Sequence, residues 1–256
     1  MIYVCVTSRD NASTIGLLLW KVRQVFLVFP REYQLLVADD ASSDGTSELL
    51  ERYARVLPLT VVTRPQPGGY AACAESLLRV ALDATDRPKR DAALMIPSDF
   101  AVSPEVIPDM IRRVESGADV VIGERQGPET SFGAALIRRS APWLLRPGLR
   151  IPGVRDLLSG CCALRLSTLK QALSDETHLL ESDGACARAE LVARAVTQAR
   201  RISVVELPAT QAVPVRDRTA LALALELYRA GRRLRIPSNP GVEWVGNGPR
   251  TERRAS

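Results

Sequence analysis

The stretch Leu35–Thr46, LLVADDASSDGT, limits the fold of this chain more than any other. An apolar run ends in Asp39 and Asp40, and small polar residues then lead into a helical pattern that starts near Thr46. A strand that ends in acidic residues places them at the carboxyl edge of a sheet, where open α/β sheets bind ligands. Two interpretations stay open: these carboxylates hold a ligand or a metal, or the segment is a solvated turn in which Asp44 only caps the helix.

Short apolar runs and helical patterns alternate through the first half of the chain. Apolar residues recur at helical spacing between Ile15 and Phe26, and Pro104 marks the start of a later helix. We expect strands at 2–6, 35–38, 60–62, 93–96 and 119–122, and helices at 15–26, 46–55, 71–82 and 104–115. Such alternation predicts an α/β fold, in which a mostly parallel sheet is flanked by helices and joined by right-handed crossovers.

The pattern changes after Gly123. Residues 126–160 are rich in glycine, proline and arginine, which predicts loops around a short helix near 134–145. Helices at 166–173 and 190–198 and a strand at 202–207 are expected next. The last predicted helix, 219–235, carries apolar residues on two opposite faces, so it is either enclosed by protein or presses one face onto another surface. Residues 238–256 are expected to form a flexible basic tail.

Composition favours one globular domain. The 256 residues are 46% hydrophobic, enough for a large core, and no apolar run reaches the roughly 20 residues that span a bilayer. The first residues lack the basic start of a secretory signal, so we expect a cytoplasmic protein. The five cysteines include no CxxC pair and are expected to be buried thiols. A lone histidine, His178, argues against a histidine-rich metal site.

The net charge of +5 belongs to the C-terminal part. From Arg216 onward there are nine arginines and four acidic residues, so residues 1–215 are balanced. This distribution argues against a nucleic-acid-binding surface over the whole domain. Four arginines within 229–235 instead follow an apolar helix. They favour docking of that helix on an anionic membrane surface, and the alternative is a core helix with a solvated basic end.

Several motifs together resemble glycosyltransferases of family 2, which have the GT-A fold. They are VTSRDN after the first strand, VADDASSDGT after the second, PSDF after the fourth and VIGER after the fifth. In the second half, IPGVRDLLSGCCALR and VVELPATQAVPVRDRT resemble segments of dolichol- and polyprenyl-phosphate hexosyltransferases. The resemblance spans roughly residues 2–219 and implies a nucleotide-sugar donor.

The resemblance also implies roles for individual residues and segments. The nucleotide-binding residues would be Thr7, Arg9, Asn11, Asp39, Asp40, Ser98 and Asp99. The diphosphate-binding residues would be Arg125, Arg216 and Arg218, and the acceptor-side residues Asp156, Ser159 and Gly160. The expected division is a nucleotide-binding half at 1–125, an acceptor half at 126–218, a C-terminal helix at 219–237 and the tail at 238–256.

The metal motif of that family is altered in this chain. Asp99 falls at the second acid of Asp-x-Asp, whereas Pro97 replaces the first and Ala101 stands two positions beyond. Mg²⁺ or Mn²⁺ could still bind through Asp99 and substrate phosphates, because Mg²⁺ commonly uses one or two carboxylates. Arginines are the alternative, since their planar side chains pair with phosphate oxygens. With Asn11 in place of an expected acid, the changes imply weak metal dependence, an unusual donor or lost activity.

The acceptor decides whether a general base is needed. Transfer to an alcohol needs one, and Asp156 is the first candidate and Glu190 the second. Both carboxylates have a structural alternative, for Asp156 hydrogen bonds to nearby backbone. A lipid phosphate needs no strong base, because it is already anionic near neutral pH, and positioning would then carry most of the rate.

The leading hypothesis is an inverting enzyme that moves a hexose from a nucleotide-diphosphate sugar to a polyprenyl phosphate. A soluble small molecule or secondary metabolite is the alternative acceptor. Pro97 favours a further alternative, a non-catalytic nucleotide-sugar-binding protein of the same fold. A nucleotidyltransferase is disfavoured, because VTSRDNAST lacks the glycine expected after the first strand of such enzymes. The protein is expected in the cytoplasm, either free or on the inner face of the membrane.

Overall fold

The computed structural model describes residues 1–125, 136, 140–141, 143–145, 151, 153–173, 180–208, 220–234, 236, 239 and 241–245. Within these residues, eight strands form one sheet in the order β3-β2-β1-β4-β6-β5-β7-β8. The strands are β1 (Ile2–Ser8), β2 (Tyr33–Asp39), β3 (Leu59–Thr63), β4 (Ala92–Met95), β5 (Val120–Arg125), β6 (Cys162–Arg165), β7 (Arg201–Leu207) and β8 (Glu243–Trp244). The helices are α1 (Ile15–Val28), α2 (Thr46–Ala54), α3 (Gly69–Ala84), the 3-10 turn η1 (Pro104–Val106), α4 (Ile107–Glu115), α6 (Leu166–Leu173), α7 (Gly184–Gln198) and α8 (Ala220–Arg233).

The sheet is mostly parallel, which confirms the predicted α/β class. β6 alone among the described strands runs antiparallel, and it lies between β4 and β5. The remaining pairs are parallel. β6 was missing from the expected strands because Cys162–Arg165 is only four residues long and follows a Ser-Gly pair, so it shows no period-2 pattern.

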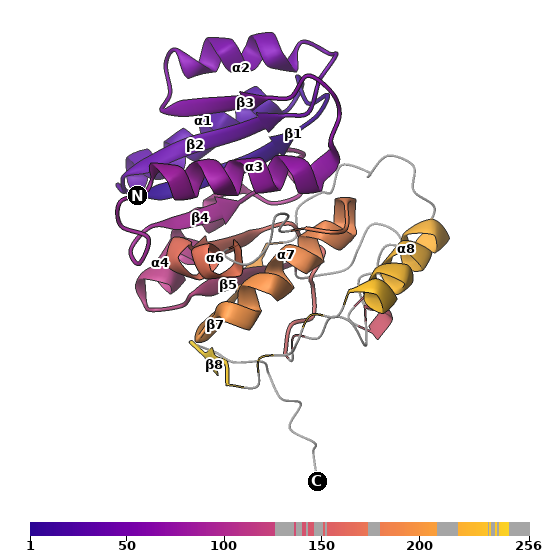
Figure 1. Ribbon diagram of the computed structural model, residues 1–256. Coiled ribbons are helices and arrows are strands. Elements are labelled where there is room, and N and C mark those ends of the chain that lie inside the picture. The colour runs from indigo at the N-terminus through magenta and orange to yellow at the C-terminus, as the bar shows by residue number, and fades with distance from the viewer. Residues whose placement is uncertain are drawn as a thin grey trace.

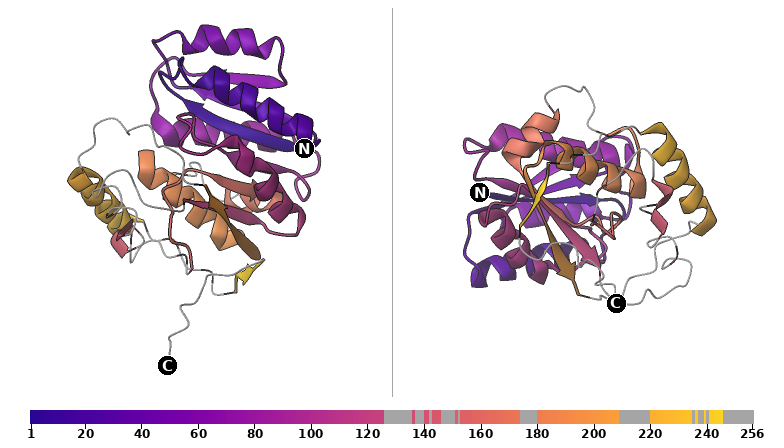
Figure 2. Two further views of the ribbon diagram at one scale, coloured as in Figure 1. Left: turned by 180° about the vertical axis from the view of Figure 1, so that it is seen from behind. Right: turned by 90° about the horizontal axis from the view of Figure 1, so that it is seen from below.

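Helices cover both faces of the sheet and make a three-layered domain. Figure 1 shows α3, α6 and α7 on one face, and Figure 2 shows α1 and α4 on the other. Alternate residues of β1 belong to the hydrophobic cores on the two faces of the sheet. Tyr3 and Cys5 pack in the core beneath α3, whereas Val4 and Val6 pack in the core beneath α1. Successive strand side chains point to opposite faces, so one apolar run supplies two cores.

The predicted helices all form where the structure describes them, with shifted ends. The largest shift is in α7, which begins at Gly184, six residues before the expected start at Glu190. Its first turn is rich in small residues, and the sequence pattern there did not show an apolar period. Half of the span of the short helix expected near 134–145 lies outside the described residues, and residues 136, 140, 141, 143 and 144 within it are helical.

One face of α8 packs against the body of the protein and the other is exposed. Leu227 and Leu234 are fully buried, and Gly231 lies so close to the backbone of residues 144–145 that a Cβ would come within 2.7 Å of it. Leu225 and Tyr228 on the other face are 45% and 41% exposed. Among the described residues, α8 therefore has one packed and one exposed face, so it is not enclosed by protein on both sides.

Two further predictions from the composition concern the cysteines and membrane-spanning segments. All five cysteines are free thiols and buried, as expected. Burial raises the pKa of the Cys162 thiol to about 12, so it stays protonated at neutral pH. No helix among the described residues has the length and apolar character needed to cross a bilayer.

Candidate functional site

A cavity of about 240 Å³ lies at the carboxyl ends of β1, β2 and β4. Parallel strands end at the same edge of a sheet, so residues far apart in the sequence meet there. The cavity brings together six of the predicted nucleotide-binding residues and one acceptor-side residue: Thr7, Arg9, Asn11, Asp40, Ser98, Asp99 and Gly160. It is completed by Ser8, Gly69, Tyr70, Cys73, Met95, Ile96, Pro97 and Arg188.

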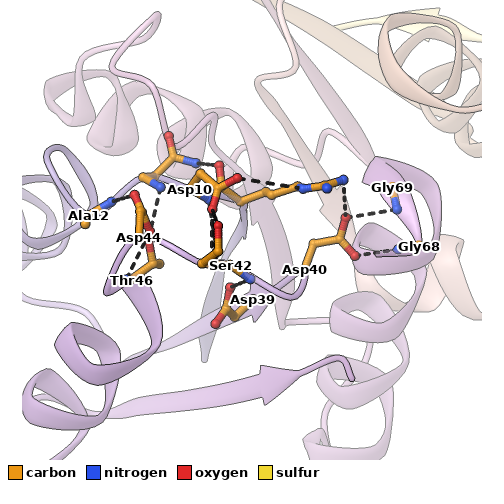
Figure 3. A network of polar contacts seen from close by, with 12 residues as sticks. Asp10, Ala12, Asp39, Asp40, Ser42, Asp44, Thr46, Gly68 and Gly69 are labelled. Carbon is orange, nitrogen blue, oxygen red and sulfur yellow. Dashed lines mark hydrogen bonds and ion pairs between the residues drawn. The ribbon is translucent and has the colours of Figure 1, made fainter. Parts of the chain in front are cut away.

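The loops after β1 and β2 are tied to each other along one wall of the site (Figure 3). Asp10 accepts a hydrogen bond from the backbone N–H of Ser43 at 2.8 Å. Asp44 accepts from the N–H of Ala12 at 2.9 Å and from that of Thr46 at 3.1 Å. The side chain of Thr46 holds the pKa of Asp44 below its usual range by donating a further hydrogen bond. Asp44 therefore bonds the first N–H of α2 from the position before the helix cap, and the N-cap itself is Gly45, which has no side-chain cap.

Asp40 is buried at the start of α3 and faces the cavity. Its two carboxylate oxygens accept hydrogen bonds from the backbone N–H groups of Gly68 and Gly69, at 2.7 Å and 3.0 Å (Figure 3). Arg64 and Arg9 approach the same carboxylate, at 3.7 Å and 4.0 Å. Helix N-termini favour negative charge, and this one fixes the orientation of Asp40.

The side chain of Asp39 points away from that of Asp40, because successive side chains of a strand point to opposite faces of the sheet. It is fully buried, and its carboxylate accepts hydrogen bonds from the backbone N–H of Ser42 and the hydroxyl of Ser47. These bonds hold the turn that leads into α2. Asp39 is absent from the lining of the cavity. Of the acidic pair that ends β2, the structure brings only Asp40 to the site.

The segment after β4 presents a single acidic side chain to the cavity. Asp99 lines it together with Pro97 and Ser98, and one oxygen of Asp99 accepts a hydrogen bond from the N–H of Ala101 at 3.0 Å. Phe100 has a φ of 57°, which is uncommon for a non-glycine residue and marks a sharp turn.

This set of side chains does not fit a divalent metal well. Among the described residues, no three histidine, cysteine, aspartate or glutamate side chains gather where they could hold an ion. Both oxygens of Asp40 already accept backbone hydrogen bonds, which leaves Asp99 as the acidic ligand on offer. Hard cations take several oxygen ligands, so most of a coordination shell would have to come from elsewhere.

Four of the lining residues that were not among the predicted site residues lie on helices α3 and α7. Gly69, Tyr70 and Cys73 lie on α3, and Arg188 lies on the second turn of α7. Burial raises the pKa of Cys73 to about 12, so this thiol is a neutral wall of the cavity. The turn Pro67-Gly68-Gly69 was a visible sign of the α3 residues, whereas nothing in the local sequence around Arg188 marked it.

Arg125 and Asp156 form a buried ion pair with each other. Arg125 donates from Nε to one oxygen of Asp156 at 2.8 Å and from a terminal nitrogen to the other at 3.2 Å. Asp156 is 2% exposed and also accepts from the N–H of Leu158. Burial raises the pKa of the neighbouring Glu124, which accepts from the backbone N–H groups of Arg155 and Asp156. Neither Arg125 nor Asp156 lines the cavity.

Glu190, the other candidate base, is also enclosed. It is fully buried, and it accepts hydrogen bonds from the N–H groups of Glu181 and Ser182 at 3.0 Å and 2.9 Å. Arg194 completes its partners at 2.8 Å. The placement of Glu190 and Asp156 favours the structural alternative that the sequence left open for both.

Other predicted residues lie beside the site or outside the described part of the chain. Ser159 is buried, and its hydroxyl accepts a hydrogen bond from the N–H of Cys161 at 3.3 Å. Arg216, Arg218 and His178 fall outside the described residues, as does most of the predicted tail.

Comparisons with known proteins agree with this architecture. The model of the family Glycosyl transferase family 2 matches residues 3–173. The dolichol-phosphate mannosyltransferase of Pyrococcus furiosus is 30% identical over 139 residues, which are 52% of this chain and 38% of that protein. The polyprenol monophosphomannose synthase of Mycolicibacterium smegmatis is 26% identical over 186 residues, or 70% of this chain and 66% of that protein. The chain thus spans well under half the length of the first relative.

A solved structure shows the same fold at lower identity. Glucosyl-3-phosphoglycerate synthase from Mycobacterium tuberculosis, in complex with phosphoglyceric acid, superposes with a TM-score of 0.61 at 20% identity. The likeness covers 90% of this chain and 77% of that one. Another structure of the same enzyme contains Mn²⁺, uridine-diphosphate-glucose and glycerol 3-phosphate, with a TM-score of 0.59. Because the family model covers two thirds of the sequence and the sheet has the expected GT-A form, the chain belongs to glycosyl transferase family 2.

Proposed function

We propose that the protein is an inverting glycosyltransferase that moves a hexose from a nucleotide-diphosphate sugar to a polyprenyl phosphate. The observation that carries this proposal is the shared cavity of Asp40 and Asp99 at the carboxyl edge of the sheet. Family membership supports the nucleotide-sugar donor. The acceptor class is supported by the two curated relatives, whose names state transfer of mannose to dolichol phosphate and synthesis of a polyprenol monophosphomannose.

The proposed reaction is a single displacement. An anionic phosphate oxygen of the acceptor attacks C1 of the sugar from the side opposite the nucleotide, and the bond from C1 to the diphosphate oxygen breaks. The electron pair of that bond stays on the leaving diphosphate, so its developing charge must be stabilised. No proton has to be removed from the acceptor. This suits a site whose two candidate bases, Asp156 and Glu190, are buried in hydrogen bonds away from the cavity.

The exposed face of α8 supports docking on a membrane surface. Leu225 and Tyr228 are exposed side by side with Arg229 and Arg232. Each arginine near an anionic leaflet contributes about 1 kcal/mol, and an apolar side chain that leaves water adds up to about 2 kcal/mol. These magnitudes are enough for reversible binding at the inner face of the membrane, where a lipid acceptor would be found.

The membrane proposal is tested by sedimentation with vesicles. We expect the protein to pellet with anionic vesicles at low salt and to be released at high salt, because screening weakens the arginine contribution. Leu225→Asp is expected to lower the bound fraction about tenfold. The matched control is Val56→Asp, which places the same charge on another exposed apolar residue, 68% exposed, outside α8. Equal binding by both variants, or no binding by the native protein at low salt, would rule out docking through α8.

The transfer itself is tested with purified protein, a panel of nucleoside diphosphates and their sugars, and a polyprenyl phosphate acceptor. We expect one base series to raise the melting temperature, since a ligand that binds only the folded state stabilises it. With the matching sugar and the lipid phosphate, we expect a nucleoside diphosphate and a glycosylated lipid by mass spectrometry.

Other outcomes of the same assay identify the alternatives. Transfer to a soluble alcohol or phosphate and never to the lipid would replace the acceptor in this proposal. Nucleotide binding without any turnover would identify a non-catalytic nucleotide-sugar-binding protein. Release of pyrophosphate would indicate a nucleotidyltransferase.

A further inference from the structure

Arg188 is a cation that faces the cavity without a carboxylate partner among the described residues. Its Nε is shut off from solvent and has no hydrogen-bond partner there. The Nε of Arg64 is also buried without a hydrogen bond, but Arg64 and Arg9 both approach the carboxylate of Asp40 within 4.0 Å and so have an acidic partner. Leaving a buried charged donor unpaired is costly, so such a group in a folded protein calls for an explanation.

The side chain of Arg188 is held in place from two sides. A Cβ on Gly160 would come within 3.1–3.3 Å of its Cδ, Nε and Cζ atoms, and Gly160 has a φ of +72° that favours glycine. On the other side, the ring of Tyr70 lies 5.2 Å from the guanidinium carbon. A cation over an aromatic ring is attracted to it, and this contact orients Arg188.

The helix that carries Arg188 is fixed relative to the helix that carries Tyr70. Asp183, just before α7, accepts a hydrogen bond from the backbone N–H of Ala71 in the first turn of α3, at 2.9 Å. A Cβ on Gly69 would overlap the Asp183 carboxylate, so that glycine permits the approach. The two helices thus contact each other beside the cavity, and Arg188 lines that cavity together with Asp40 and Asp99.

The charges around the cavity indicate that the ligand of Arg188 is an anion. The carboxylate of Asp40 is already matched by two backbone donors and two arginines, and Asp99 offers a single acidic group. The planar guanidinium of an arginine pairs strongly with carboxylates and phosphates, because it can donate to two of their oxygens at once. We propose that Arg188 binds the diphosphate of the nucleotide sugar and stabilises the leaving group, in the place that a metal held by two acids would otherwise fill.

This inference rests on the proposed nucleotide-sugar donor and adds a specific residue and a metal-independent mode of diphosphate binding. As the bond from C1 breaks, the negative charge grows on the diphosphate oxygens, and the N–H groups of Arg188 donate to them. Arg188 would then contribute to binding of the diphosphate and not to binding of the base or ribose.

The test is calorimetric titration of the folded protein with nucleoside, nucleoside monophosphate and nucleoside diphosphate, in the uridine and guanosine series, with EDTA and with Mn²⁺. We expect the native protein to bind the diphosphate in EDTA. We expect Arg188→Met to lower the affinity for the nucleoside diphosphate at least tenfold and the affinity for the nucleoside less than threefold. The diphosphate affinity of Arg188→Lys is expected to lie between those of the native protein and Arg188→Met. The matched control is Arg79→Met, which removes an arginine from the exposed surface of α3, where it pairs with Glu75.

The outcomes separate this inference from the proposed function. If the native protein binds the diphosphate and Arg188→Met binds it equally well, or loses nucleoside and diphosphate alike, the role of Arg188 is wrong and the donor class stands. Binding of the diphosphate only with Mn²⁺ also overturns the inference. If no nucleotide of either series binds the native protein, both proposals fail. Arg188→Gln carries the same expectation if the methionine variant does not fold, as judged by circular dichroism.

Discussion

Replacing Arg125 with methionine is expected to lower the free energy of unfolding by about 3 kcal/mol, because it leaves the buried carboxylate of Asp156 without its counter-ion. Asp156 is 2% exposed, and Arg125 pairs with both of its oxygens. The Arg125 side chain is 27% exposed, so the cost belongs at the lower end of the range for broken buried pairs. Urea unfolding at 25 °C, followed by circular dichroism, measures the difference.

The double variant Arg125→Met, Asp156→Asn separates charge from packing. A neutral amide no longer needs a counter-ion, and its oxygen can still accept from the N–H of Leu158. We therefore expect the double variant to be more stable than Arg125→Met. Equal stability of the two would show that the ion pair is not the source of the effect.

The same single variant tests the predicted diphosphate role of Arg125. Since Arg125 is occupied by Asp156 and does not line the cavity, we expect Arg125→Met to change the affinity for a nucleoside diphosphate less than threefold. A tenfold loss, measured where the variant is fully folded, would place Arg125 in the diphosphate site as the sequence motif implies.

The second large effect is expected at Asp40. Asp40→Asn should weaken nucleoside diphosphate binding about 100-fold. An asparagine offers one acceptor oxygen to the two N–H groups of Gly68 and Gly69, and its own N–H₂ must face one of them. In the proposed site the charged carboxylate of Asp40 also accepts hydrogen bonds from the bound nucleotide. Hydrogen bonds to a charged group contribute roughly 1.5–3 kcal/mol, and each 1.4 kcal/mol is a factor of ten in affinity. The change in affinity is measured by titration calorimetry with the nucleotide that stabilises the native protein.

Asp91→Asn is the matched control for Asp40→Asn. Asp91 is also a buried carboxylate, 1% exposed, and it accepts from the N-terminal amine at 2.7 Å and from Thr85 at 2.5 Å. It immediately precedes β4 and so lies at the opposite edge of the sheet from the cavity. We expect it to lower the melting temperature and leave nucleotide affinity unchanged. An Asp40→Asn affinity within threefold of the native value would contradict the proposed site.

The spacing of apolar residues predicted the strands and helices that have a long, regular apolar pattern. It did not predict elements whose position depends on contacts with residues far away in the sequence. The first five strands and the helices between them follow from alternation and from turn residues such as Pro67-Gly68-Gly69. β6 could not be predicted, because its pairing with β4 and β5 joins residues about 70 and 40 positions apart. The start of α7 was also missed, because its contacts with α3 are tertiary.

The same division applies to the candidate site. Asp40 and Asp99 follow strands in the sequence, so their shared edge could be predicted, and the structure brings them to one cavity. Asp39 looked equivalent to Asp40, yet the strand turns its side chain to the opposite side, toward Ser42 and Ser47. Arg188 sits inside a helix and meets the cavity only through the packing of α7 on α3. No local motif could have identified it.

The reversed strand in the middle of the sheet has a consequence for dividing the protein. β5 pairs only with β6 and β7 among the described strands, and both follow it in the chain. A fragment that stopped at residue 125 would leave β5 with no neighbour and would bare the edge of β4. We therefore expect that the predicted nucleotide-binding half, residues 1–125, would not fold as a separate module. A chimera or split version that keeps the site intact must carry the chain through at least β7, since Gly160 and Arg188 close the cavity from that later portion.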